Sequence, residues 1–129
     1  IPNEVFRAIK DFRFSCLNKK FRTKENYEVY QWYCENLLTR YVMMPSGEIT
    51  VQSRGNPSGQ ISTTMDNNIC NTFFQAFEFA YLRPDLDVDE LRLSWNRVDS
   101  LIYGDDRLTT LPDCPDDYVE RVVSMYADV

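Results

Sequence analysis

The stretch of sequence that most constrains the fold is RVDSLIYGDDRLTTL, residues 97–111. It places two short β-prone runs on either side of Gly104 and Asp105. A two-residue connection of this kind joins antiparallel strands in a hairpin. Gly104 tolerates the positive φ that such a tight turn requires. We expect the hairpin to be covered by other elements of the chain, since a sheet buries one face against a second layer.

Helical spacing dominates the remaining sequence. Apolar residues recur at helical intervals in four ranges, 1–20, 26–41, 62–82 and 115–129. A second hairpin is expected at residues 41–53, around the turn sequence Pro-Ser-Gly at 45–47. The resulting order is helix, helix, hairpin, helix, hairpin, helix. It predicts an α+β fold with a small antiparallel sheet covered by helices.

Residue types at the segment ends predict where the helices begin and end. Asn3 is expected to cap the first helix. Ser62 or Thr63 is expected to cap the long third helix, which should end near Leu82. Pro115 suits the first position of the last helix, because its missing N–H has no intrahelical partner there.

The absence of histidine excludes several kinds of site. No Ser-His or Cys-His nucleophile can form, and a Cys/His zinc site is excluded. The four cysteines are scattered without a CxxC pair, so they are interpreted as reduced, mostly buried thiols of an intracellular protein: Cys16, Cys34, Cys70 and Cys114. Any catalysis would depend on carboxylates, metals, lysine or tyrosine.

Charge and hydropathy bound the class of protein. No apolar run approaches the roughly 20 residues of a membrane span. The net charge is −6, but residues 1–40 hold eight Lys and Arg against five acids, and the remainder holds six against fifteen. This asymmetry suits a phosphate-contacting face beside a cation site, or simply two solvated faces of opposite sign.

One acidic run imitates a calcium loop. Asp85, Asp87 and Asp89 have the spacing that opens an EF-hand. Glu90 stands where the turn glycine belongs, and Asn96 stands where the bidentate glutamate belongs. We therefore do not predict a calcium site there.

The sequence alone allows two interpretations of the neighbouring residues Asp105 and Asp106. Adjacent carboxylates repel each other unless a cation lies between them. Mg²⁺ prefers such oxygen ligands and usually takes one or two carboxylates together with substrate phosphates. The hairpin is thus either a cation site or a solvated acidic turn, because Gly-Asp is also ordinary turn chemistry.

A polar face is predicted at the start of the third helix. Thr63 and Asn67 lie four residues apart and share one side, which Asn71 and Gln75 extend. The preceding loop at 58–59, Ser-Gly, adds a hydroxyl and backbone N–H groups. Such groups suit a sugar hydroxyl or a phosphate, whereas the alternative is a capped amphipathic helix with a polar solvent face.

Taken together, the two segments resemble the palm subdomain of viral RNA-dependent RNA polymerases. Residues 55–68, GNPSGQISTTMDNN, contain the family's motif B pattern at Ser58, Gly59, Thr63 and Asn67. Residues 103–106, YGDD, match its motif C. The fuller wording, with QAFEFAYL and YGDDRL, is similar to polymerases of the astrovirus type. Reverse transcriptases also use paired aspartates in a hairpin, but they lack this Ser-Gly-x-x-x-Thr-x-x-x-Asn helix.

The resemblance implies a partial palm, a fragment of a larger right-hand polymerase. Its parts would be the helix after motif A, the motif B loop and helix at 55–82, the motif C hairpin at 98–111, and the start of the motif D helix at 115–129. The motif A aspartate would then precede Ile1, and the family's motif D lysine would follow Val129.

The resemblance also implies nucleotidyl transfer by a two-metal mechanism with Mg²⁺, or alternatively Mn²⁺. Asp105 would be the principal metal ligand of the hairpin and Asp106 a secondary one. Asn67, with Thr63, would recognise the ribose 2′-hydroxyl, while Ser58 and Gly59 would form a mobile loop around template and nucleotide.

Partners and setting follow from the same resemblance. They are an RNA template and primer, nucleoside triphosphates and the rest of a viral polyprotein, in replication complexes of the host cell cytoplasm. This 129-residue piece is expected to be inactive alone. The alternative function is a small acidic cation-binding or protein-interaction module in which Gly-Asp-Asp is only a turn.

Overall fold

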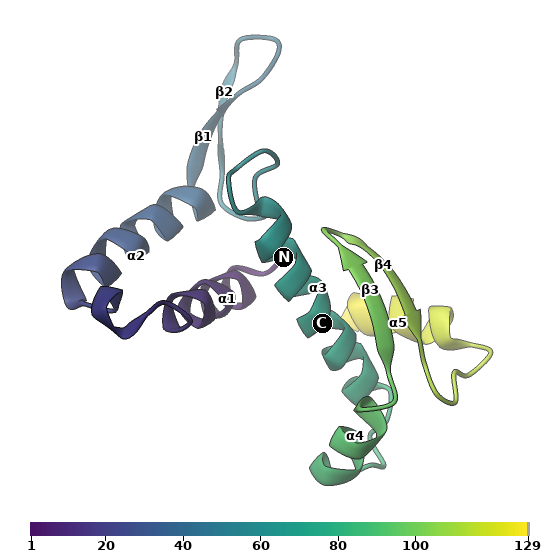
Figure 1. The fold of residues 1–129 in the computed structure, drawn as a ribbon. Coiled ribbons are helices and arrows are strands. Elements are labelled where there is room, and N and C mark those ends of the chain that lie inside the picture. The colour runs from purple at the N-terminus through teal and green to yellow at the C-terminus, as the bar shows by residue number, and fades with distance from the viewer. Residues whose placement is uncertain (129) are drawn as a thin grey trace. The chain divides into compact units, whose positions relative to one another are not determined.

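A computed structural model describes residues 1–128 of the chain (Figure 1). The described residues form five α-helices, one short 3-10 helix and two two-stranded antiparallel sheets, which fits the predicted α+β class. Each predicted hairpin forms its own sheet. The chain divides into two compact units, Ile1–Cys70 and Asn71–Val129. Within residues 1–128, no helix combines the length and apolar character that a membrane crossing requires.

The first unit builds its core from the inner faces of two helices. Its elements are α1 (Asn3–Ser15), η1 (Lys19–Phe21), α2 (Lys24–Leu38), β1 (Arg40–Met43), β2 (Ile49–Gln52) and the first residues of α3 (Thr63–Tyr81). Helices α1 and α2 lie against each other. The buried apolar side chains of this unit are Phe6, Ile9, Cys34, Leu38 and Cys70. Within α1 and α2 these residues are three or four positions apart, so they lie on one side of each helix.

The first hairpin forms where the sequence predicts it, whereas the second helix begins at Lys24, two residues before the predicted range of 26–41. Strands β1 and β2 pair antiparallel from Arg40 opposite Gln52 to Met43 opposite Ile49. Gly47 has φ +87° in the connecting turn, a conformation that glycine adopts without strain. Helix α2 is capped by the hydroxyl of Thr23, which accepts a hydrogen bond from the backbone N–H of Asn26.

The predicted cap of the first helix is wrong. Pro2, not Asn3, is the N-cap residue of α1, and no side chain caps that end. The Asn3 side chain instead donates through Nδ2 to the carbonyl oxygen of Ser53, at 2.9 Å. The Asn3 side chain, which local pattern assigns to the helix end, is therefore used in a tertiary contact with a residue 50 positions away.

The second unit combines a largely exposed hairpin with helical segments. It comprises the remainder of α3, α4 (Val88–Trp95), β3 (Asp99–Tyr103), β4 (Asp106–Thr110) and α5 (Tyr118–Asp128). Its buried apolar side chains are Phe79 and Met125. Helix α3 ends one residue before the predicted Leu82.

Acidic residues lie at the starts of two helices in this unit, where they satisfy or accept the first helical hydrogen bonds. Asp87 and Glu90 form a reciprocal capping box at α4, which accounts for the run that imitates a calcium loop. Helix α5 begins at Tyr118, so the predicted start at Pro115 is wrong. The carbonyl of Asp117 accepts the first helical hydrogen bond, from Arg121 N, and aspartate is favoured at such a position.

The cysteines are free, but only half of them are buried. Cys34 and Cys70 are buried, whereas Cys16 and Cys114 are exposed, so the expectation of mostly buried thiols is wrong in part. Burial raises the pKa of the Cys34 thiol, and burial raises that of Cys70 to about 11. Because the thiolate is the nucleophile, both buried thiols should be unreactive near neutral pH.

Iodoacetamide is therefore expected to modify two cysteines of the folded protein at pH 8. Cys16 and Cys114 should react, and Cys34 and Cys70 should react only after denaturation. Peptide mass mapping of native and urea-treated samples measures this difference. Equal rates at Cys34 and Cys16 in the folded protein would contradict the packing described above.

Candidate functional site

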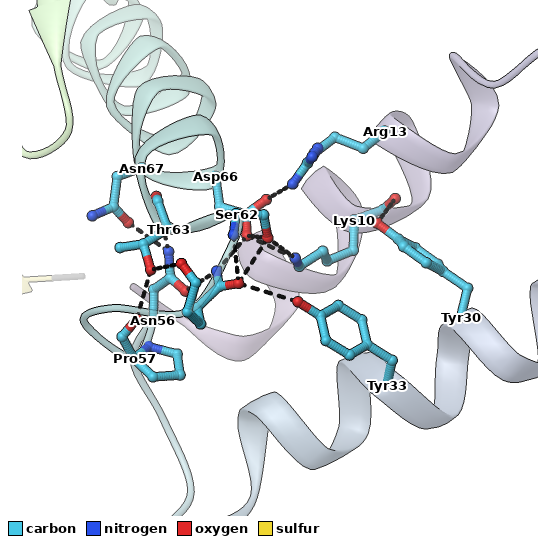
Figure 2. Close-up of polar contacts among 11 residues, drawn as sticks. Lys10, Arg13, Tyr30, Tyr33, Asn56, Pro57, Ser62, Thr63, Asp66 and Asn67 are labelled. Atoms are coloured by element: carbon cyan, nitrogen blue, oxygen red, sulfur yellow. Dashed lines mark hydrogen bonds and ion pairs between the residues drawn. The ribbon is translucent and has the colours of Figure 1, made fainter.

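The predicted loop and helix residues of motif B lie in the first unit. Ser58 and Gly59 are exposed in the loop before α3, and Gly59 has φ +80°. Thr63 and Asn67 lie one turn apart at the start of α3 and are partly exposed. Asn56 links the two, because its Nδ2 atom lies 2.8 Å from Asn67 Oδ1 and 3.3 Å from the Thr63 carbonyl oxygen (Figure 2).

The hydroxyl groups at the start of α3 donate to the preceding loop and to Asp66. Thr63 Oγ1 lies 2.7 Å from the carbonyl oxygen of Pro57 and 2.8 Å from that of Gln60. Ser62 Oγ lies 2.8 Å from a carboxylate oxygen of Asp66 and 2.9 Å from Gln60 Oε1. Ser62 directly precedes the first helical residue, and its carbonyl oxygen accepts from Asp66 N at 2.9 Å, which is the backbone arrangement expected of the predicted N-cap residue.

Beneath this loop lies a buried ion cluster that the sequence did not reveal. Asp66 is fully buried, and its carboxylate contacts Lys10 Nζ at 2.6 Å and Arg13 at 2.5 Å (Figure 2). Lys10 is itself 1% exposed. The only local signal is the i, i+3 spacing of Lys10 and Arg13, which places both cations on one side of α1.

Two opposing effects act on the Asp66 carboxylate. Burial by itself would raise its pKa, because a charged group loses hydration in the interior. Hydrogen bonds from Lys10, Ser62 and Arg13 outweigh that effect and lower the pKa below its usual value. Asp66 is therefore an anion at neutral pH, held at the base of the loop.

Tyrosines of α2 support the same cluster. Tyr33 donates its hydroxyl hydrogen to Gln60 Oε1 at 3.1 Å, and Lys10 Nζ lies 5.2 Å from the centre of the Tyr33 ring (Figure 2). Tyr30 donates to the backbone carbonyl of Lys10 at 3.1 Å. Tyr30 and Tyr33 thus act as structural support.

The second unit presents the Gly-Asp-Asp turn at the tip of its hairpin. Tyr103 pairs with Asp106, which leaves Gly104 and Asp105 as the two turn residues. Gly104 has φ +64°, and Asp105 has no positive φ, the combination that a type II′ turn requires. Asp105 and Asp106 are both exposed.

Helix α3 binds this hairpin through Asn71 and Gln75, two side chains that were predicted to extend a ligand-binding face. Asn71 Nδ2 donates to the carbonyl oxygen of Asp105 at 3.1 Å. Gln75 Oε1 accepts from the hydroxyl of Thr109 at 2.7 Å. Both amides therefore bind the hairpin, and Gln75 is 5% exposed, so it forms no part of an open polar face.

A second buried acid strengthens this attachment. Glu78 is 2% exposed and accepts from Arg107, the residue directly after the turn aspartates, at 2.6 Å. It also accepts from the hydroxyls of Tyr118 at 3.1 Å and Tyr126 at 2.8 Å. Burial, together with Glu78, raises the pKa of both tyrosines, so they remain donors at neutral pH. The Arg107 charge is thus paired with Glu78 next to the exposed carboxylates.

The carboxylates of the turn are suitable ligands for a divalent cation. Two exposed carboxylates of adjacent residues offer the hard oxygen ligands that Mg²⁺ prefers, and such ions commonly complete their shell with water and phosphate. Among residues 1–128, no group of three or more acidic, cysteine or histidine side chains is arranged to hold a metal. Asp105 and Asp106 can therefore supply part of a metal's coordination.

Comparison with known proteins gives a consistent result. A family model described as viral RNA-dependent RNA polymerase matches residues 1–129. The non-structural polyprotein 1AB of Mink astrovirus 1 is 67% identical over the whole chain, and that of Ovine astrovirus 1 is 62% identical. The corresponding polyprotein of Human astrovirus-4 is 53% identical. The chain covers 9%, 10% and 9% of these relatives, respectively, and no solved structure matches it.

Proposed function

Because the chain belongs to the viral RNA-dependent RNA polymerase family, we propose that it forms part of the palm of an enzyme that copies viral RNA. The motif B loop and helix would occupy residues 55–82 and the motif C hairpin residues 98–111. The helix that follows motif A and the first part of the motif D helix, at 115–129, would flank them. The structural observation that best supports this proposal is the Gly-Asp-Asp turn, with exposed carboxylates and a backbone bound by Asn71.

Asp105 and Asp106 would hold the catalytic cations. Asp105, at the turn, would be the principal ligand, and Asp106, at the start of β4, a secondary one. Bound Mg²⁺, or Mn²⁺ in its place, would favour ionisation of the primer 3′-hydroxyl and stabilise the charge on the departing pyrophosphate. The hydrogen bond from Asn71 would limit the movement of the turn, so that the carboxylates need little reordering.

Residues of the first unit would select the nucleotide. Asn67, with Thr63, would contact the ribose and distinguish its 2′-hydroxyl from the hydrogen of a DNA precursor. Ser58 and Gly59 would adjust around template and nucleotide, since both lie exposed in the loop. The buried carboxylate of Asp66 supports the helix turn from which Asn67 projects.

The partners would be an RNA template and primer, nucleoside triphosphates and the rest of the polyprotein. Replication complexes in the host cytoplasm would be the setting. The basic residues of the loop between α1 and α2 are exposed and available to phosphates: Lys19, Lys20 and Arg22.

A primer-extension assay tests the proposal. A full-length polymerase containing this chain is expected to extend an RNA primer on an RNA template with Mg²⁺. The 129-residue chain alone should incorporate no nucleotide, because Asp105 and Asp106 form only part of a coordination shell. Absence of extension by the full-length enzyme would contradict the function. Mg²⁺-dependent incorporation by the short chain would contradict its predicted inactivity.

A further inference from the structure

We propose that Asn56 orients the side-chain amide of Asn67 so that Asn67 presents an N–H donor, and the ribose 2′ group is recognised as an acceptor. This inference rests on the proposed function, because it concerns the polarity of the same nucleotide contact. It assigns Asn56 and Gln60 as positioning residues. Figure 2 shows Asn56 beside Asn67 and Thr63, on the side of the helix start where the loop packs.

Two groups of known polarity determine the orientation of the Gln60 amide. The backbone N–H of Ser62 can only donate, and it lies 2.8 Å from Gln60 Oε1. The anionic carboxylate of Asp66 can only accept, and it lies 3.0 Å from Gln60 Nε2. Rotating this amide by half a turn would break both hydrogen bonds. Lys10 and Arg13 keep Asp66 in its anionic form.

The orientation of the Gln60 amide determines that of the Asn56 amide. Gln60 Nε2 also lies 3.0 Å from Asn56 Oδ1, so the oxygen of that amide accepts from Gln60. Its nitrogen lies 3.3 Å from the backbone carbonyl of Thr63, which can only accept. Asn56 is therefore held in one orientation from both ends of its amide.

Asn67 is the last residue in this series. Asn56 Nδ2 donates to Asn67 Oδ1 at 2.8 Å, which uses the oxygen of the Asn67 amide. Across the described residues 1–128, Asn67 Nδ2 makes no hydrogen bond, and the side chain is partly exposed. Asn67 therefore offers a ligand N–H groups, whose partner has to be an acceptor. A 2′-hydroxyl meets this need through its oxygen.

Ribose analogues separate the two polarities. A 2′-hydroxyl can donate or accept, a 2′-fluorine can only accept, and a 2′-hydrogen does neither. The wild-type full-length polymerase is expected to use 2′-fluoro nucleotides more efficiently than 2′-deoxy nucleotides. The ratio of their kcat/KM values should be roughly two to ten, the range that a single hydrogen bond of ordinary strength produces.

The Asn56→Asp variant should reverse the polarity. A carboxylate at position 56 can still accept from Gln60 but cannot donate to Asn67, so the Asn67 amide turns and presents its oxygen. The ratio of 2′-fluoro to 2′-deoxy efficiency should then fall to about one. Natural nucleotides should remain preferred over 2′-deoxy nucleotides, because the 2′-hydroxyl can donate to the oxygen.

Two further variants keep the test decisive. Asn56→Ala removes the hydrogen bonds without adding charge and should lower the same ratio partway, because Asn67 can then adopt both orientations. Asn36→Asp makes the same chemical change on an exposed position of α2 and should leave the ratio unchanged. General damage to the fold would lower all three efficiencies together and would leave the ratio intact.

The outcomes distinguish this inference from the proposed function. If the wild-type polymerase copies RNA but Asn56→Asp and Asn56→Ala both keep the wild-type ratio of 2′-fluoro to 2′-deoxy efficiency, Asn56 does not orient Asn67. A wild-type ratio of one would also overturn the inference. If the wild-type polymerase incorporates no nucleotide of any kind, the proposed function itself fails.

Discussion

Replacing Asp105 with asparagine is expected to lower nucleotide incorporation by a full-length polymerase about a thousandfold or more. Metal ions contribute several kcal/mol of transition-state stabilisation in such reactions, which corresponds to this factor. Asparagine keeps the shape of the side chain but removes the negative charge. The fold should be unaffected, because Asp105 is exposed and its contact with Asn71 involves only the backbone carbonyl.

Primer extension at saturating Mg²⁺ measures this loss. Asp99→Asn provides the matched control, because Asp99 is an exposed aspartate of the same hairpin and lies away from the turn. It should retain nearly full activity. Asp106→Asn should lose less than Asp105→Asn. If Asp105→Asn kept a tenth or more of wild-type activity, Asp105 would not be the principal metal ligand.

Removing the Asp66 carboxylate should have the largest effect on stability. Asp66→Ala leaves the ammonium group of Lys10 buried without its main partner, and loss of one member of a buried ion pair costs about 3–5 kcal/mol. Urea denaturation of the chain, followed by tryptophan fluorescence, measures the free energy of unfolding. The double variant Lys10→Met/Asp66→Ala should recover part of the loss, because it removes the unpaired charge.

An exposed ion pair in the same unit is the control. Arg7 and Glu35 form a salt bridge with nearly half of each side chain exposed. Because solvent screens such a pair, Glu35→Ala should cost no more than about 1 kcal/mol. A loss for Asp66→Ala no larger than that for Glu35→Ala would contradict the described burial of the cluster.

The contribution of Asp66 should also depend on pH. Its pKa is lower in the folded state than the usual value of 3.8, so folding favours the ionised carboxylate. The stabilisation is therefore fully present above pH 3.8 and is lost as the pH falls through the folded-state pKa. The difference in unfolding free energy between wild type and Asp66→Ala should shrink over that acidic range.

Local pattern was sufficient for both hairpins, for the existence of four of the five α-helices and for the family. A glycine followed by aspartate between two β-prone runs indicated the second hairpin, and the structure pairs Tyr103 with Asp106 around it. Residue types at the segment end indicated where the long helix ends to within one residue. These features depend on neighbours in the sequence, so the sequence contains the information that determines them. The family was recognisable for the same reason, because its signal lies in short runs of neighbouring residues.

Only the tertiary structure decided which side chains meet. Nothing in the local sequence indicates a partner for Lys10, yet it is buried against Asp66, 56 positions later. Asn71 and Gln75 looked like a ligand face, yet they bind the hairpin more than 30 residues away. Helical periodicity indicates that such residues share a side, but the partner on that side depends on how distant segments pack. The sequence by itself thus determined most of the elements and the family, and packing decided which groups support the turn and the Asn67 amide.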